Sequence, residues 1–225
     1  MNASATAPAP GALAAVGEEL AATVDALRRV TVQVRTRGPG IGAGVVWGGD
    51  GLVITNAHVA RGDRVRVDLW DGTVAEARVF ARDRERDLAA LRCDRAPLPG
   101  GAVLGDSRQL RAGDLVIAVG HPNGDVGAAT VGVIHVVDAP ADGPPRWICA
   151  DLRLAPGYSG GPLADAGGRV VGINTMIHGG LALAVPASAV EAFLARAAGQ
   201  SVSAAPRPGR RAPVAPGARI QGRRR

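Results

Sequence analysis

Apolar and polar residues recur with two different periods along this chain. In residues 12–29 the apolar positions return at steps of three and four, which predicts an amphipathic helix. These positions are Leu13, Val16, Leu20, Val24 and Leu27. From Val30 to Val185 the period changes to two, in short runs that are separated by turn signals such as Asp71-Gly72. The pattern predicts one helix followed by an all-β body.

The runs with a period of two are short and regularly spaced. The predicted strands are residues 30–36, 41–47, 51–55, 64–70, 73–82, 87–93, 114–120, 128–137, 146–152, 169–177 and 181–185. They divide near residues 97–101 into two groups of about six, and no helical crossover separates them, so the pattern favours antiparallel barrels or a sandwich over βαβ units. A second helix is predicted for residues 188–198, because Ser188 and Glu191 form a capping box and Gly199 follows the last turn.

Composition and charge narrow the class of protein. Hydrophobic residues make up 47% of the 225 residues, which is enough for a packed core. The net charge of +6 comes from the end of the chain, because residues 205–225 carry seven arginines and no acid. The remaining body has nineteen arginines against twenty acids, so nucleic acid is not the expected partner, and the arginine-rich end is expected to be a solubilising tail.

Cysteine content and the N-terminus indicate the compartment. Cys93 and Cys149 are too few for a disulfide framework and are expected to be free thiols on strands. The first residues have neither a basic segment nor an apolar run long enough for a signal peptide or a membrane span. The expected location is therefore cytoplasmic.

The candidate chemistry starts in the loop from Ala155 to Leu163. It holds Ser159 between glycines, an arrangement that gives up side-chain packing and exposes bare backbone. If Ser159 is a nucleophile, the N–H groups of Gly157 and Ser159 can point together at the oxyanion of an acyl-transfer intermediate. The alternative interpretation of such a loop is a tight turn between strands.

A serine nucleophile needs a base, and the base needs an orienting acid. His58 directly follows a predicted strand, whereas His121 and His135 are expected to be structural. Asp87 opens another predicted strand and is favoured as the acid over Asp83 and Asp94.

The order of these residues excludes an α/β-hydrolase elbow. That plan places the acid and then the histidine after the serine, but only His178 follows Ser159, with too little chain for the rest of the sheet. The order His58, Asp87, Ser159 is instead that of chymotrypsin.

The segments around these residues resemble the HtrA/DegP family of trypsin-like serine proteases over about residues 20–195. The similar segments are residues 42–46, 51–59, 87–91, 104–107, 113–124, 156–163, 171–175 and 184–186. The resemblance implies two six-stranded antiparallel β-barrels, at about residues 30–96 and 112–186, within a protease domain at 12–200. Residues 1–11 would be a disordered lead and residues 201–225 a disordered tail.

The resemblance also implies roles for single residues. His58 would be the base, Asp87 its orienting acid and Ser159 the nucleophile, with the N–H groups of Gly157 and Ser159 forming the oxyanion hole. No cofactor or metal is implied. The expected substrates are polypeptides that are unfolded or misfolded.

Two departures from the family pattern bear on function. Tyr158 stands where the family commonly has asparagine, and its bulk could alter access to the cleft. No PDZ domain follows the protease segment in this sequence, so regulation by such a domain is not expected. A homo-oligomer, for instance through the helix at residues 12–29, stays open, with packing of that helix on a barrel as the alternative.

The specificity pocket can be predicted in part. Arg153 lies six residues before Ser159, where trypsin has an acid, and it would repel basic side chains. By the resemblance, the wall consists of Leu154 and the loop Met176, Ile177 and His178. These residues predict cleavage after small or medium aliphatic side chains. The main alternative to an enzyme is a catalytically weak protease fold that binds peptides, with Tyr158 obstructing the oxyanion hole.

Overall fold

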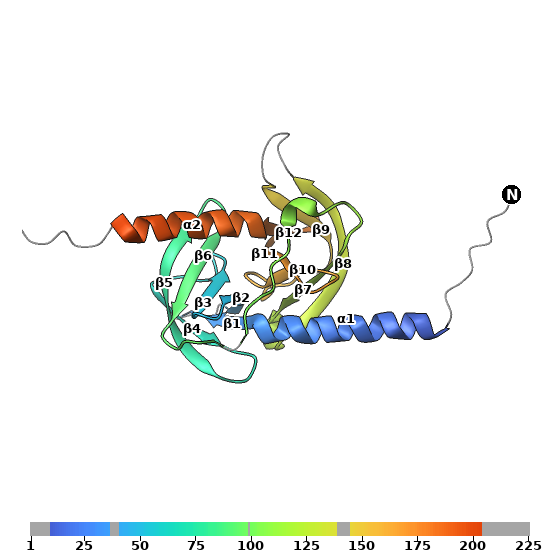
Figure 1. Ribbon diagram of the computed structural model, residues 1–225, viewed down its shortest axis with the longest axis horizontal. Helices are drawn as coiled ribbons and strands as arrows, with labels where there is room; N and C mark the ends of the chain where they lie inside the picture. Colours follow the sequence, from blue (N-terminus) through green and yellow to red (C-terminus); the bar gives the residue numbers. More distant parts are fainter. Residues whose placement is uncertain (1–9, 37–40, 99, 139–144, 204–225) are drawn as a thin grey trace, which may run out of the picture.

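The computed structural model describes residues 10–36, 41–98, 100–138 and 145–203, and the chain there forms two closed antiparallel barrels with a helix at each end (Figure 1). The first barrel consists of β1 (Thr31–Arg35), β2 (Ile41–Gly48), β3 (Leu52–Thr55), β4 (Arg64–Asp68), β5 (Val74–Asp83) and β6 (Leu88–Cys93). The second consists of β7 (Leu115–Gly120), β8 (Ala128–Asp138), β9 (Trp147–Asp151), β10 (Pro162–Asp165), β11 (Val170–His178) and β12 (Leu181–Pro186). The helices are α1 (Pro10–Val30) and α2 (Ala187–Ser203), with short 3-10 turns η1 (Ser107–Gln109) and η2 (Pro122–Gly124). The predicted fold class is confirmed.

Alternation of side chains along the strands explains why each barrel closes. In β4, Val65 and Val67 are buried while Arg64 and Arg66 are exposed, so the strand presents one apolar face to the interior. The strands run around the two barrels in the orders β1-β2-β3-β6-β5-β4 and β10-β11-β12-β9-β8-β7. Closure leaves neither barrel with an open sheet edge.

The core has three parts. One fills the first barrel around Val34 and Leu91, and another fills the second barrel around Ile134 and Leu163. The third lies between the barrels, where Leu88 packs in one cluster with residues of the second barrel and of both helices. Its members include Ile117, Val119, Ile173, Leu27 and Phe193. This shared core fixes the two barrels against each other, so loops from both barrels can form one site.

The helices extend further than the sequence pattern predicts. Helix α1 begins at Pro10, since proline has the φ angle of a first helical residue and its missing N–H is not needed there. Its apolar stripe is buried only towards the C-terminal end, at Leu27, whereas Leu13 and Val16 are exposed. Figure 1 shows this first half of α1 projecting beyond the second barrel.

The predicted end of α2 at residue 198 is wrong. The helix continues through Gly199 to Ser203, because glycine weakens a helix by about 1 kcal/mol but does not prevent helical geometry. In the described part of the chain, no helix combines the length and the apolarity that a membrane span requires. The remainder of the predicted lead and tail, at residues 1–9 and 204–225, lies outside the described residues.

Strand β10 is absent from the sequence prediction. It begins at Pro162, directly after two glycines, and its four residues are too few to show a period of two. Its pairing with β7 and β11 identifies it as a strand and closes the second barrel. The predicted free thiols are confirmed, with Cys93 on β6 buried and Cys149 on β9 partly buried.

Candidate active site

Three loops from the two barrels meet where the sequence predicts a catalytic site. His58 follows β3 and Asp87 precedes β6, and these strands pair with Thr55 opposite Ala89, so the two loops leave the barrel at the same end. The loop before β10 carries Ser159, whose carbonyl accepts a 2.8 Å hydrogen bond from the N–H of Ala43 on β2. This bond attaches the serine loop of the second barrel to the first barrel.

His58 and Asp87 form a close pair. Nδ1 of His58 lies 2.6 Å from Oδ2 of Asp87, and the backbone N–H of His58 donates to Oδ1 at 3.0 Å. The side chain of His58 is 45% exposed and that of Asp87 only 15%, so the ring faces solvent while the carboxylate lies behind it. With the Nδ1 proton donated to Asp87, Nε2 is free to accept a proton.

Asp87 is held in an unusual backbone conformation. Its φ angle is 54°, in the left-handed region that few residues other than glycine adopt, although aspartate and asparagine tolerate it best. Burial raises the pKa of Asp87, but the hydrogen bonds that it accepts from His58 and Thr175 outweigh this effect and bring its pKa below the ordinary value. The carboxylate therefore stays ionised at neutral pH and can stabilise a protonated His58.

Thr175 on β11 connects the acid to the serine, and the sequence analysis assigns it no role. Its hydroxyl donates to Oδ2 of Asp87 at 2.5 Å, and its carbonyl accepts a 3.0 Å hydrogen bond from Oγ of Ser159. Within the described residues, no hydrogen bond joins Ser159 to His58. The structure thus brings His58, Asp87 and Ser159 into one site through Thr175, with the serine hydroxyl turned towards the Thr175 carbonyl.

The backbone around Ser159 offers two unused donors. Neither the N–H of Gly157 nor that of Ser159 donates to another described group, while the neighbouring N–H groups of Tyr158 and Gly160 are bonded to Ala155 and Asn174. Gly157 has a φ angle of 112°, a conformation that L-residues rarely adopt. Two free N–H groups on either side of one residue are the arrangement that an oxyanion requires.

Replacing Gly157 by alanine is expected to displace its N–H group from the oxyanion hole. The expected result is a decrease in kcat of about 10²- to 10³-fold, the usual effect of losing one oxyanion donor. A Cβ at this position would lie 2.7 Å from both the carbonyl carbon of His121 and Cα of Pro122, so the loop must shift. Gly72→Ala is the control, since Gly72 also has a positive φ angle but faces open space. Steady-state kinetics measure kcat of both variants, and circular dichroism checks that both are folded. An equal loss of kcat in the two variants would contradict this prediction.

An apolar pocket of about 230 Å³ opens beside Ser159. Its lining consists of Leu154, Ala155, Pro156, Tyr158, Ser159, Thr175, Met176 and Ile177. The predicted wall residues Leu154, Met176 and Ile177 are among them, whereas His178, the last residue of β11, is not. The expectation for Arg153 is wrong as well: its side chain is exposed and does not line the pocket.

Tyr158 lies under the serine loop rather than across it. It is only 6% exposed and packs in the core of the second barrel, and a Cβ on Gly120 would lie 2.9 Å from its Cδ1 atom. The ring therefore contributes to the inner side of the apolar pocket. This position does not support the idea that Tyr158 obstructs the oxyanion hole.

His121 is part of the support beneath the same loop. Its backbone N–H donates to the carbonyl of Gly157 at 2.9 Å, and its buried ring accepts the N–H of Gly127 at Nδ1 at 3.2 Å. Burial lowers the pKa of His121, because a charged imidazolium is poorly solvated there. The neutral ring is thus the form that the fold selects, as expected for a structural histidine.

This burial predicts a loss of stability in mild acid. Below pH about 6.5, His121 takes up a proton in the unfolded chain more readily than in the folded chain. The free energy of unfolding should therefore decrease as the pH is lowered, by up to ~1.4 kcal/mol per pH unit. Urea titrations at several pH values between neutrality and pH 5 measure the slope. His121→Asn should remove this component, whereas His135→Asn, at an exposed site on β8, should retain it. An unchanged slope in His121→Asn would contradict the assignment.

Two closed antiparallel barrels with His58, Asp87 and Ser159 between them are the architecture of a trypsin-like peptidase domain. Residues 42–173 match the family model of the trypsin-like peptidase domain. The chain belongs to this family.

Proteins similar to this chain within the family include HtrA-type proteases. Mitochondrial serine protease HTRA2 of Bos taurus is 40% identical over 164 residues, covering 69% of this chain and 36% of that protein. Chloroplastic Protease Do-like 1 of Arabidopsis thaliana is 39% identical over 151 residues, covering 62% and 34%. The solved structure of the HtrA-type protease AlgW with a tripeptide superimposes with a TM-score of 0.71 at 31% identity, covering 78% of this chain and 62% of that one. The chain spans about a third of the length of such curated relatives.

Proposed function

We propose that this chain is a serine endopeptidase that hydrolyses peptide bonds through His58, Asp87 and Ser159. The observation that carries the proposal is the 2.6 Å contact between Nδ1 of His58 and Oδ2 of Asp87 in the same site as Ser159. Family membership supports the same activity, because similar proteins such as HTRA2 of Bos taurus are named serine proteases.

The proposed reaction begins with rotation of the Ser159 side chain. Its hydroxyl leaves the Thr175 carbonyl and points to Nε2 of His58, which takes the proton as Oγ attacks the carbonyl carbon of the substrate. The N–H groups of Gly157 and Ser159 then hold the oxyanion, while Asp87 stabilises the charged ring. His58 gives the proton to the leaving amine, and a water molecule activated in the same way releases the acyl group from Ser159.

The alternative, a weak protease fold that only binds peptides, depends on an obstruction that the structure does not support. Tyr158 is buried, and the N–H groups of Gly157 and Ser159 are free of described partners. The enzyme therefore accounts for more of the site than the binding module does.

The proposed substrates are unfolded or misfolded polypeptides. Cleavage needs an extended segment that can reach Ser159 and the pocket beside it, and an unfolded chain exposes such segments more readily than a folded one. The test compares fragments released from an unfolded, permanently alkylated protein and from the same protein in its folded state, with Ser159→Ala as the blank. Fragments from the unfolded form alone are expected. Release from the folded form at an equal rate would contradict the substrate class.

The proposed preference is for small or medium aliphatic residues before the scissile bond. The pocket beside Ser159 is lined by Leu154, Met176 and Ile177, and it contains no charged side chain among its described lining. A panel of fluorogenic peptides that differ only at this residue should give the highest kcat/KM for valine, alanine or leucine. A preference for arginine or lysine would contradict the assignment of this pocket.

A further inference from the structure

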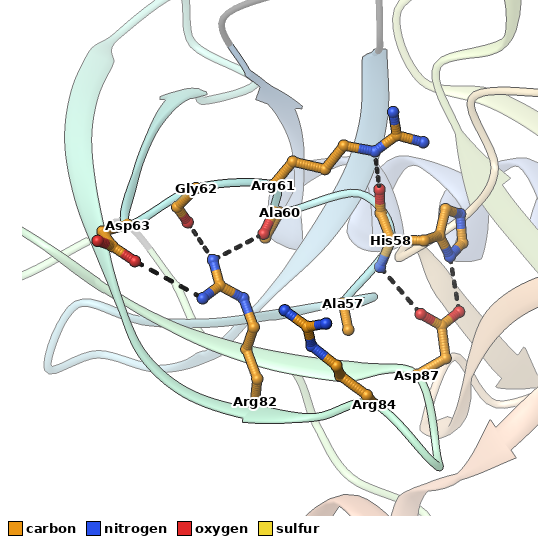
Figure 2. A pocket seen from close by; sticks show the side chains of 9 residues that line it. All are labelled: Ala57, His58, Ala60, Arg61, Gly62, Asp63, Arg82, Arg84 and Asp87. Carbon is orange, nitrogen blue, oxygen red and sulfur yellow. Dashed lines mark hydrogen bonds and ion pairs between the residues drawn. The ribbon is translucent and has the colours of Figure 1, made fainter.

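A second and larger pocket opens on the first-barrel side of the site. It measures about 530 Å³ and lies between the segment after β3 and the end of β5 (Figure 2). Its lining consists of Ala57, His58, Ala60, Arg61, Gly62, Asp63, Arg82, Arg84 and Asp87. Three arginines therefore line one hollow that is also lined by the His58–Asp87 pair.

One of these arginines holds the pocket together. Arg82 donates from Nη2 to the carbonyls of Ala60 and Gly62, so it fixes the segment after β3 to the end of β5. Its ion pair with Asp63 is long, at 3.7 Å, and the side chain of Asp63 is 98% exposed, so solvent screens this pair. Arg82 is a structural part of the pocket wall.

The other two arginines have donors to spare. Arg84 has no hydrogen-bond or ion-pair partner among the described residues, and Figure 2 shows its guanidinium group lying between those lining residues rather than outside them. Arg61 uses Nε, which donates to the carbonyl of His58 at 3.0 Å, and Figure 2 shows its terminal nitrogens on the far side of that carbonyl from Arg84. A guanidinium group has five N–H donors and matches a carboxylate well.

The acids nearby do not neutralise Arg84. Asp87 is bonded to His58 and Thr175, and Asp83 forms ion pairs with Arg86 and Arg196. The lining has three arginines against two aspartates, Asp63 and Asp87, so its formal net charge is +1, which an anionic ligand would compensate.

The two pockets lie on opposite barrels and adjoin through the hydrogen bond between Thr175 and Asp87. In an extended peptide, successive side chains point to opposite sides. If one side chain enters the apolar pocket of the second barrel, an adjoining side chain faces the first barrel.

We propose that the arginine-lined pocket binds the carboxylate of an aspartate or glutamate residue next to the residue in the apolar pocket. Arg84 is the ligand, because its guanidinium group lies within the hollow and has no partner among the described residues. The inference rests on the proposed function insofar as the substrate polypeptide runs past Ser159. It makes acidity next to the scissile bond a determinant of substrate choice.

The test measures binding, so it does not depend on catalysis. Each fluorescent peptide has a valine that occupies the apolar pocket. One pair of peptides has glutamate or glutamine directly before this valine, and a second pair has them directly after it. The Kd of each peptide is measured with the Ser159→Ala protein. At one of these positions, the peptide with glutamate should bind about fivefold more tightly than the peptide with glutamine. This ratio corresponds to the upper range of the free energy of a partly solvated ion pair. The difference should shrink at ~1 M salt, where the Debye length is about 3 Å.

Variants assign the effect to the pocket. Arg84→Gln should bring the affinities for the two peptides together. Arg61→Gln should retain most of the difference, because the terminal nitrogens of Arg61 lie apart from Arg84. Arg78→Gln is the matched control, since Arg78 is an exposed arginine on the same strand as Arg82 and lies outside the pocket lining, and it should retain the full preference. Equal affinities in the Ser159→Ala protein at both positions, or an undiminished preference in Arg84→Gln, would overturn the inference.

The proposed function is tested separately with the same peptides. Cleavage by the wild-type protein with equal binding of both peptides would overturn the arginine-pocket inference alone. Preferential binding of glutamate without any cleavage would support that inference and contradict the endopeptidase.

Discussion

Replacing Ser159 by alanine is expected to lower kcat on a peptide substrate by about 10⁴- to 10⁶-fold, because nucleophile, base and acid act as one unit. The residual rate comes from binding and from the oxyanion donors, which this substitution leaves in place. The fold should be unaffected, since among the described residues the Oγ atom makes one hydrogen bond, to the Thr175 carbonyl. Steady-state kinetics at substrate saturation measure the effect.

The control for Ser159→Ala is its thermal unfolding. An unchanged Tm with the predicted fall in kcat assigns the loss to chemistry. A variant that retains more than about a tenth of the wild-type kcat would contradict the role of Ser159 as the nucleophile.

Replacing Asp87 by asparagine is expected to lower kcat by about 10⁴-fold. The amide presents an N–H group where Nδ1 of His58 now finds a carboxylate oxygen at 2.6 Å, so the ring is held in the wrong tautomer and its charged form loses its counterion. Asparagine is chosen because it tolerates the φ angle of 54° at this position as well as aspartate does. Stability should therefore change much less than activity.

The matched control for Asp87→Asn is Asp25→Asn. Asp25 is on α1, where its side chain is 63% exposed and pairs with Arg28, outside the site. The control should keep the wild-type kcat, since exposed ion pairs contribute little. A loss of less than about tenfold in Asp87→Asn would contradict the orienting role of this carboxylate.

The fold can be predicted from sequence wherever the period of two is visible. Strands such as β4 and the first half of β5 show this alternation of apolar and polar side chains, because one face of each is buried in a barrel. Strand β10 shows none, because its first residue is proline and its register is determined by β7 and β11, which are remote in the sequence. The end of α2 is missed for a related reason, since Gly199 permits a helix although it is a poor helix former.

The candidate site is predictable where a residue type by itself carries the chemistry. His58, Asp87 and Ser159 stand in loops at strand ends, and the structure brings their loops together. Thr175 has no such signal, because its contact with Asp87 depends on how the second barrel docks on the first. Its place in a buried strand makes it look like an ordinary β-sheet residue.

Side-chain direction explains the two errors in the specificity pocket. Arg153 lies between Leu152 and Leu154, which pack in the core of the second barrel, so its exposed side chain points the other way. Neither Arg153 nor His178 lines the pocket, although both are close to it along the chain. The arginine-lined pocket shows the opposite case. Residues 82–86 alternate basic and acidic side chains and look like a solvated surface, but Arg82 bonds the segment after β3 and a hollow forms beside His58.

The most direct test of the account is covalent labelling of the wild-type protein with a fluorophosphonate probe, read by mass spectrometry of the intact chain and of its peptides. One adduct per chain, located on Ser159 and absent from Ser159→Ala, is the predicted result. A folded wild-type protein that takes up no probe, or that is labelled equally in the Ser159→Ala variant, would contradict the claim that His58 and Asp87 activate this serine.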